Sequence, residues 1–163
     1  MTKQYDFSRR FGFLVGEVGR LYGRLFDQLA RERLGLSRAQ CRLLAAVASS
    51  EGGRSWTQAE LAQRLDLTAM GVATLVDRME AGGWLQRTPS PTDRRANQIT
   101  LNPKAYAAFD DALLLSNQVQ EMALAGFGAD EQTALVAALQ RVLGNLQGAS
   151  APRADAAPTT RRP

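Results

Sequence analysis

The sequence predicts a mainly α-helical fold with one small β-hairpin, and three observations lead to this prediction. Residues 57–83 contain two short amphipathic helices joined by a tight turn. Two strand-like segments follow directly, at 84–88 and 97–101. Long helical patterns flank this unit at about 6–33 and 103–147. Together they indicate a winged helix-turn-helix with additional helices at both ends.

A chain of 163 residues is expected to form one domain with a real hydrophobic core. We expect that domain to span 1–147, with the winged helix-turn-helix at about 37–101. Residues 148–163 are rich in Ala, Pro, Thr and Arg and show no hydrophobic periodicity. They are therefore predicted to form a disordered, solubilising tail.

The first helix is expected over about 6–33. Its apolar residues recur at three- and four-residue steps: Phe7, Phe11, Leu14, Val15, Val18, Leu21, Tyr22, Leu25 and Leu29. This stripe is too long for one small domain to cover, so it indicates a partner subunit. The helix also carries four glycines on one line, each costing about 1 kcal/mol relative to alanine. Tolerated drift, a close helix crossing in a dimer and space for a ligand are all open interpretations of Gly12, Gly16, Gly19 and Gly23.

The second helix is expected after Gly35, which ends the first, with Ser37 as its N-cap and its end near Ala48. Its inner face is predicted to contain Cys41, Leu44, Ala45 and Ala48. One cysteine excludes an internal disulfide and fits a reducing cytoplasm. Because the chain has no histidine and this face is apolar, Cys41 is interpreted as a small buried hydrophobe.

The helix-turn-helix is predicted from its caps. Thr57 and Glu60 have the spacing of a capping box, and Thr68 is a good N-cap for the second of the two helices. The dipeptide at 66–67 forms the turn, and Gly82-Gly83 ends the second helix. The inward stripe of that helix is Val72, Leu75, Val76 and Met79. In units of this kind the second helix lies in the DNA major groove.

The wing is predicted as two strands, Trp84–Thr88 and Asn97–Leu101, the second with alternating apolar and polar residues. Pro89–Arg94 is a turn-forming tip that ends in charge. A short strand around Trp56 should pair with this hairpin.

Two further helices are expected after the wing. Asn102-Pro103 provides an N-cap and a first-turn proline for a helix that runs to about Ala125 and has Tyr106, Phe109, Leu113 and Val119 among its apolar positions. Gly126 to Gly128 breaks the pattern, and Asp130 is predicted to cap a last helix that ends near Leu146. This helix has an apolar seam, which indicates a dimerisation surface: Leu135, Leu139, Val142 and Leu146.

The run LVDRMEAGGWLQRTPSPTDRRANQITLNPKA resembles the wing region of the MarR/SlyA transcription regulators. The upstream run LGLSRAQCRLLAAVASSEGGRSWTQAELAQRLDL resembles the helices that precede it in that family. The resemblance covers roughly 7–146. It implies a homodimeric repressor, interlocked through its N- and C-terminal helices, that binds a pseudo-palindromic operator in double-stranded DNA. It also implies a small, phenolic or anionic effector bound between the dimer helices and the winged helix.

The resemblance also assigns roles in the wing. Asp93 and Arg95 match residues with which the family uses its wing to enter the minor groove, and on an extended segment both project from one side. Arg94 points the other way and would meet phosphate. Some relatives sense oxidants through a cysteine in the first helix, which is not where Cys41 lies. The candidate DNA-binding residues are Thr57, Gln58, Thr68, Ala69, Met70, Gly71, Ala73, Thr74, Arg78, Asp93, Arg94 and Arg95.

The outward side of the second helix is unusually bare. We call it the recognition face: Ala69, Met70, Gly71, Ala73, Thr74 and Asp77. It lacks Arg and Asn, the usual bidentate partners of guanine and adenine, and family members often carry Arg where this chain has Thr74. Small side chains would let the helix sit deep, with Met70 and Ala73 against thymine methyls. Specificity should then depend on DNA shape and on the wing.

Composition excludes several other functions. Without histidine, neither a Ser/His nor a Cys/His catalytic pair can be drawn, so we expect no enzyme activity and no cofactor. No stretch approaches the ~20 apolar residues of a membrane span, and we expect a cytoplasmic protein. The 20 basic and 16 acidic residues and the pI near 9.8 favour a polyanionic partner. The alternative is a winged-helix module that binds protein through the recognition face and has no operator.

Overall fold

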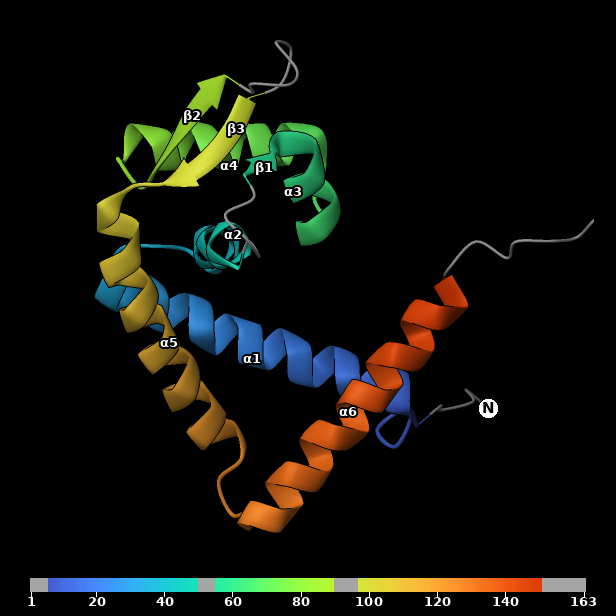
Figure 1. Ribbon diagram of the computed structural model, residues 1–163. Helices are drawn as coiled ribbons and strands as arrows, with labels where there is room; N and C mark the ends of the chain where they lie inside the picture. The colour runs from blue at the N-terminus through green and yellow to red at the C-terminus, as the bar shows by residue number, and fades with distance from the viewer. Residues whose placement is uncertain (1–5, 50–54, 90–96, 151–163) are drawn as a thin grey trace, which may run out of the picture. The chain divides into compact units, whose positions relative to one another are not determined.

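The computed structural model describes residues 6–49, 55–89 and 97–150, and it confirms the mainly α-helical winged fold (Figure 1). Contacts divide the chain into two units, Met1–Ala123 and Leu124–Pro163. The first contains helices α1 to α5 and a three-stranded sheet, and the second contains α6. The elements are α1 Phe11–Leu34, α2 Arg38–Ala48, β1 Trp56–Thr57, α3 Gln58–Leu65, α4 Ala69–Ala81, β2 Leu85–Pro89, β3 Asn97–Leu101, α5 Pro103–Ala123 and α6 Ala129–Ser150.

The predicted helix caps of the helix-turn-helix region are confirmed. Ser37 and Thr57 each form a complete capping box, with Gln40 and Glu60 respectively. The Thr68 hydroxyl accepts a hydrogen bond from the N–H of Gly71 at the start of α4. These side chains satisfy N–H groups that have no partner within their own helices, so α2, α3 and α4 begin where the sequence predicts.

Glycines end two of the helices in the left-handed conformation. Gly35, at φ 65°, is the C-cap of α1. After α4, Gly83 has φ 70° and donates its N–H to the carbonyl of Glu80, while Trp84 donates to Met79. This pair of bonds is a Schellman motif, which needs a residue that tolerates positive φ at Gly83. It fixes the direction in which the chain leaves α4 and enters the wing.

The sheet has the strand order β1-β3-β2 and is antiparallel throughout. Trp56 pairs with Ile99, which confirms the short strand expected beside the wing, and Leu85 pairs with Leu101. The first wing strand begins at Leu85 instead of Trp84, because the Trp84 N–H closes the turn after α4. The tip between β2 and β3, residues 90–96, lies outside the described residues.

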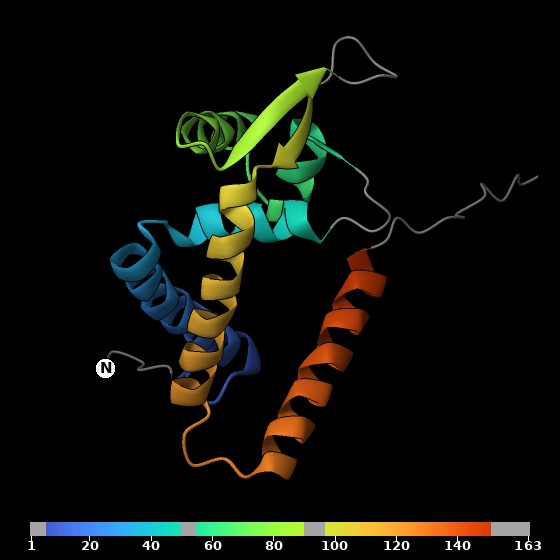
Figure 2. The same ribbon diagram turned by 60° about the vertical axis from the view of Figure 1, so that its left-hand side comes forward.

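Helix α2 lies at the centre of the first unit, with α1 and α5 on one side and the helix-turn-helix and β3 on the other (Figures 1 and 2). Its buried residues include Leu43 and Leu44, which are almost completely inaccessible to solvent. The core continues through side chains from every neighbouring element: Ala30, Leu36, Leu61, Leu65, Val72, Val76, Met79, Leu85, Ile99, Ala105 and Leu115. The predicted inner face of α2 omitted the buried Leu43, and it included Ala48, which is exposed.

The predicted starts of two helices outside the winged core were wrong. Helix α1 begins at Phe11 instead of near Asp6, because the Asp6 carboxylate accepts from the Ser8 N–H at 2.8 Å and folds this segment into a turn. Helix α6 begins at Ala129, so Asp130 lies in its first turn and is not the N-cap. The Gly128 N–H at this start is satisfied by the carboxylate of Glu131, at 2.8 Å.

The C-terminal expectations are partly corrected. Helix α5 ends at Ala123, about two residues early, and α6 continues past Leu146 to Ser150. Residues 148–150 of the predicted tail are therefore helical, and 151–163 lie outside the described residues. No proline interrupts α6 before Pro152, which is compatible with this longer helix.

Helices α1 and α6 each have apolar side chains that their own unit leaves exposed. On α1 they include Phe11, Leu14, Val15, Val18 and Leu21. On α6 the predicted seam is exposed at Leu135, Leu139 and Leu146 and half-buried at Val142. Both helices are therefore amphipathic, and each has an exposed apolar face.

The glycine line of α1 splits into two parts. A Cβ atom added at Gly12, Gly16 or Gly19 would meet no described atom of this chain within 4 Å. At Gly23 it would lie 2.7 Å from the guanidinium carbon of Arg38, so this glycine makes room for an arginine from α2. The helix backbone at the first three glycines is therefore open among the residues that the structure describes.

Asp27 connects α1 to the start of α2. Its carboxylate accepts from the Arg31 side chain at 2.8 Å and from the Arg38 N–H at 2.6 Å. The first of these bonds, then the second, lowers the pKa of Asp27 below its ordinary value. A lowered pKa means that the ionised carboxylate stabilises the fold above about pH 4, and that this contribution is lost as the pH falls further.

We therefore expect Asp27→Asn to lower the free energy of unfolding by about 0.5–1 kcal/mol at pH 7, since the carboxylate is partly exposed. The difference from the parent chain should shrink as the pH falls below about 4. Urea unfolding at fixed protein concentration measures both values. Glu17→Gln, which removes an exposed pair with Arg20 on the same helix, is the matched control and should have little effect. An equal loss at pH 7 and pH 2.5 for Asp27→Asn would contradict this account.

Candidate functional site

The recognition face of α4 is exposed, as the sequence predicts. Met70 is 80% exposed, Ala69, Gly71, Thr74 and Asp77 are exposed, and Ala73 is half-buried. The opposite stripe holds the helix in place, because Val72, Val76 and Met79 have no solvent-accessible surface. The predicted side chains are thus brought together on one exposed helix surface.

The three threonine candidates differ in the hydrogen bonds that remain open to them. The Thr57 hydroxyl accepts from the Glu60 N–H and donates to the Glu60 carboxylate, so its proton is used within the cap. The Thr68 hydroxyl accepts from Gly71 and keeps its proton for another acceptor, such as a phosphate. Thr74 donates to the Met70 carbonyl at 3.0 Å, which leaves its lone pairs to accept from a base amino group.

The remaining candidates lie at the edges of this surface or beyond it. Gln58 is half-buried in the first turn of α3, and Arg78 is exposed in the last turn of α4. Asp93, Arg94 and Arg95 lie outside the described residues. The strands that lead to them end at Pro89 and resume at Asn97, a paired position in the sheet.

Arg87 joins the wing to the recognition helix. From β2 its guanidinium reaches two carboxylates of α4, Asp77 and Glu80, at 2.5 Å each, and its N–H donates to Glu80 at 2.9 Å. Partial burial disfavours the charged guanidinium, but the hydrogen bonds to these carboxylates outweigh it and raise the pKa of Arg87. This contact was not predicted from the sequence. The available signal was the alternation of β2, which places Arg87 on the same side of the strand as buried Leu85.

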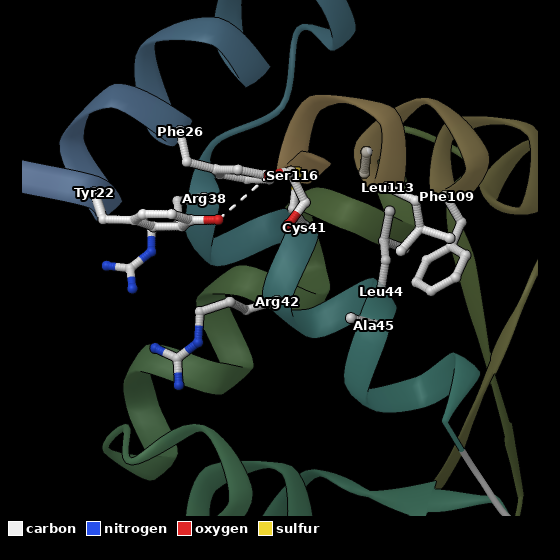
Figure 3. A pocket seen from close by; sticks show the side chains of 11 residues that line it. Tyr22, Phe26, Arg38, Cys41, Arg42, Leu44, Ala45, Phe109, Leu113 and Ser116 are labelled. Carbon is white, nitrogen blue, oxygen red and sulfur yellow. Dashed lines mark hydrogen bonds between the residues drawn. The ribbon is translucent and has the colours of Figure 1, made fainter. Parts of the chain in front are cut away.

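A cavity of about 370 Å³ lies in the first unit between α1, α2 and α5 (Figure 3). Its walls are mainly apolar, and the Tyr22 hydroxyl donates to the Ser116 carbonyl across one side, at 3.3 Å. Two arginines of α2, Arg38 and Arg42, supply its positive charge. The sequence analysis left the ligand site open. The lining residues are Tyr22, Phe26, Arg38, Cys41, Arg42, Leu44, Ala45, Phe109, Ala112, Leu113 and Ser116.

Cys41 lines this cavity but is buried, as predicted. Burial, and then the nearby carboxylate of Asp27, raise the pKa of the Cys41 thiol to about 11. The group is therefore a protonated thiol at neutral pH, which is a poor nucleophile. This supports the interpretation of Cys41 as a packing residue.

The structure offers no metal centre within the described residues, where no group of three or more Cys, Asp or Glu side chains could hold an ion. Among the helices described, none combines the length and apolar character that a membrane crossing requires.

Comparisons with known proteins agree with this geometry. A family model described as "MarR family" matches residues 34–96. The HTH-type transcriptional repressor NicR of Pseudomonas putida is 25% identical over 145 residues, which are 89% of each chain. The crystal structure of transcriptional regulator PA3341 is 33% identical, with a TM-score of 0.70, over 85% of this chain and 98% of that one. A structure of BpsR of Bordetella bronchiseptica concerns the regulation of its DNA binding by 6-hydroxynicotinic acid. It is 22% identical, with a TM-score of 0.71, over 86% of this chain and 98% of that one.

The Arg87 contact generates a stability prediction. We expect Arg87→Met to lower the free energy of unfolding by about 1–3 kcal/mol, because Glu80 is left partly buried without its cation. Double-mutant cycles with Glu80→Gln and Asp77→Asn, measured by urea unfolding, separate the two pairs. The coupling to Glu80, whose side chain is 38% exposed, should exceed the coupling to Asp77, which is 66% exposed. Absence of coupling in both cycles would show that Arg87 does not hold the wing.

Proposed function

The chain belongs to the MarR family of transcriptional regulators, and from this premise we propose that it is a homodimeric repressor that binds a pseudo-palindromic operator in double-stranded DNA. The observation that carries the proposal is the exposed recognition face of α4, held beside the wing strands by Arg87. This arrangement presents a helix and a hairpin on one surface, which is how winged helices contact a major groove and the adjacent minor groove.

Each subunit would place residues 68–79 in the major groove and its wing tip in the minor groove. The small side chains of the recognition face support a close approach of the helix to the base edges. Base discrimination by hydrogen bonds would be modest, because that face has no Arg or Asn. Arg95, matched by family resemblance, would supply a cation to a narrow A·T-rich minor groove, with Asp93 orienting it.

The dimer would form through α1 and α6. Their exposed apolar side chains indicate a surface that another subunit covers, and the family resemblance assigns both helices to the dimer. Gly12, Gly16 and Gly19 fit a close helix crossing in this interface, since no residue within 6–49, 55–89 and 97–150 places an atom within 4 Å of a Cβ added there. Cavity space for a ligand is the other explanation of the same glycines.

The effector would be an aromatic carboxylate bound in the cavity between α1, α2 and α5. A volume of about 370 Å³ with aromatic and aliphatic walls suits a single aromatic ring, and Arg38 and Arg42 suit its anionic group. BpsR, whose DNA binding is regulated by 6-hydroxynicotinic acid, shares this fold, so that acid is a reasoned first probe. The protein would act by binding, in the cytoplasm, without catalytic activity.

We expect binding to duplex DNA from the region upstream of the protein's own gene to weaken steeply with salt, because phosphate contacts release counterions. Arg95→Ala should lower operator affinity by about 1–3 kcal/mol and relax discrimination at outer A·T-rich positions. Arg94→Ala is the matched control and should weaken binding uniformly across sequences. Fluorescence anisotropy at several salt concentrations measures all three. Binding that is absent or independent of salt would instead favour a protein-interaction module that uses the recognition face.

The glycine line gives a test of the dimer. If α1 crosses another helix closely, Gly16→Leu and Gly19→Leu overpack the crossing and weaken the dimer by about 1–3 kcal/mol. If the glycines line ligand space, the same variants stay dimeric and bind operator but lose the response to effector. Sedimentation equilibrium, together with operator binding in the presence of 6-hydroxynicotinic acid, distinguishes the two. Variants that remain dimeric and responsive would show that the glycines serve neither purpose.

A further inference from the structure

The turn between α3 and α4 is held in an uncommon backbone conformation. Asp66, which follows the last residue of α3, has φ 54° and ψ 52°. Within the described part of the chain it is the one residue other than glycine with positive φ. Residues other than glycine adopt this left-handed backbone conformation rarely, so neighbouring contacts are expected to hold Asp66 in it.

Three hydrogen bonds hold this turn. The N–H groups of Asp66 and Leu67 donate to the carbonyls of Gln63 and Ala62, at 3.4 and 3.0 Å. The third bond comes from outside the helix-turn-helix: the Arg42 guanidinium of α2 donates to the Leu65 carbonyl at 3.1 Å. The last carbonyls of a helix have no partner within it, so Arg42 satisfies a group that the turn itself leaves open.

The same arginine lines the cavity between α1, α2 and α5. Figure 3 shows its side chain extending from α2, beside the cavity wall, with the guanidinium at the far end. Arg38 lies one helical turn earlier and also lines the cavity, but its guanidinium packs against Gly23 of α1. Of the two cavity arginines, Arg42 is therefore the one whose guanidinium donates a hydrogen bond to the helix-turn-helix.

We propose that Arg42 is the positioning residue through which an aromatic carboxylate in the cavity loosens the turn before the recognition helix. The proposal rests on the proposed function, because it assigns the coupling between that cavity and the DNA-binding surface. In it, the carboxylate of the ligand draws the guanidinium away from the Leu65 carbonyl, and α4 loses part of its support.

The direction of the change follows from bond strength. A carboxylate accepts two charge-assisted hydrogen bonds from a guanidinium, and each is stronger than a bond to a neutral carbonyl. A ligand anion within reach of Arg42 therefore competes successfully with Leu65. Because coupling between two sites is reciprocal, operator DNA should lower the affinity for the carboxylate by the same factor.

The test compares Arg42→Met, Arg42→Lys and Arg38→Met. The last is the matched control, since it removes the same charge from the same helix and the same cavity. Hydrogen exchange of the Asp66 and Leu67 amides, without DNA or ligand, reports the turn directly. We expect exchange to accelerate by about fivefold or more in Arg42→Met, to change less in Arg42→Lys, and to stay near the parent rate in Arg38→Met.

Operator binding with and without 6-hydroxynicotinic acid then measures the coupling. In the parent chain the acid should weaken operator binding by about fivefold or more, a typical size for such coupling. In Arg42→Met, operator affinity should already be reduced without the acid, and the further effect of the acid should disappear. Arg42→Lys keeps the charge with a single-point donor and should recover part of the response. Arg38→Met should bind the acid more weakly but keep the response at saturating concentrations.

Several outcomes would overturn the proposal. Amide exchange at the turn that is the same in Arg42→Met and Arg38→Met would show that Arg42 does not hold it. A full response to the acid in Arg42→Met would show that the signal takes another route. Calorimetry that detects no binding of 6-hydroxynicotinate, benzoate or 4-hydroxybenzoate by the parent chain would exclude the ligand class. Absence of operator binding by the parent would refute the proposed function instead, and the exchange comparison would still decide whether Arg42 holds the turn.

Discussion

The burial of α2 is the constraint on which the rest of the first unit depends. Leu43 and Leu44 are buried because α1 and α5 pack against one side of α2, and the helix-turn-helix and β3 pack against the other. A short helix in this position can move only if both sets of neighbours adjust, since close-packed interiors deform little. Helix α2 therefore lines the cavity and also packs against the helix-turn-helix. A side chain of α2 that contacts both is placed to couple them.

Local signals predicted the winged core because each element there is bounded by its own caps. The capping boxes at Ser37 and Thr57, the N-cap at Thr68 and the left-handed Gly83 are decided within four residues of sequence. Prediction failed where a local competitor took the capping role. The Asp6 carboxylate forms a turn, so α1 does not begin where apolar periodicity placed it. The Glu131 carboxylate satisfies the N–H of Gly128, so α6 begins one residue before Asp130, its predicted N-cap.

The candidate site was predicted in one part only. Exposure of the recognition face follows from the apolar stripe opposite it, which is a property of one helix. The contacts of Arg87 with α4 and of Arg42 with Leu65 join residues that are distant in the sequence. Periodicity gives the side of an element on which such a residue lies but not the partner that it meets. The cavity likewise results from the packing of three helices and has no local signature.

Because the recognition face has few side chains that can read bases, DNA specificity should depend mainly on the position and angle of α4. An arginine would discriminate a base by two hydrogen bonds. In the proposed complex, the small side chains of Ala73 and Thr74 would contact DNA only if the helix lay at the right depth and angle. That angle depends on the contacts that hold the two ends of α4. The Thr68 cap and the turn at Asp66 hold the beginning of α4, and the ion pair of Arg87 with Glu80 holds its end next to the wing. A helix that binds through placement should also be sensitive to small displacements, so one hydrogen bond at the turn can change DNA affinity without any change in the recognition face itself.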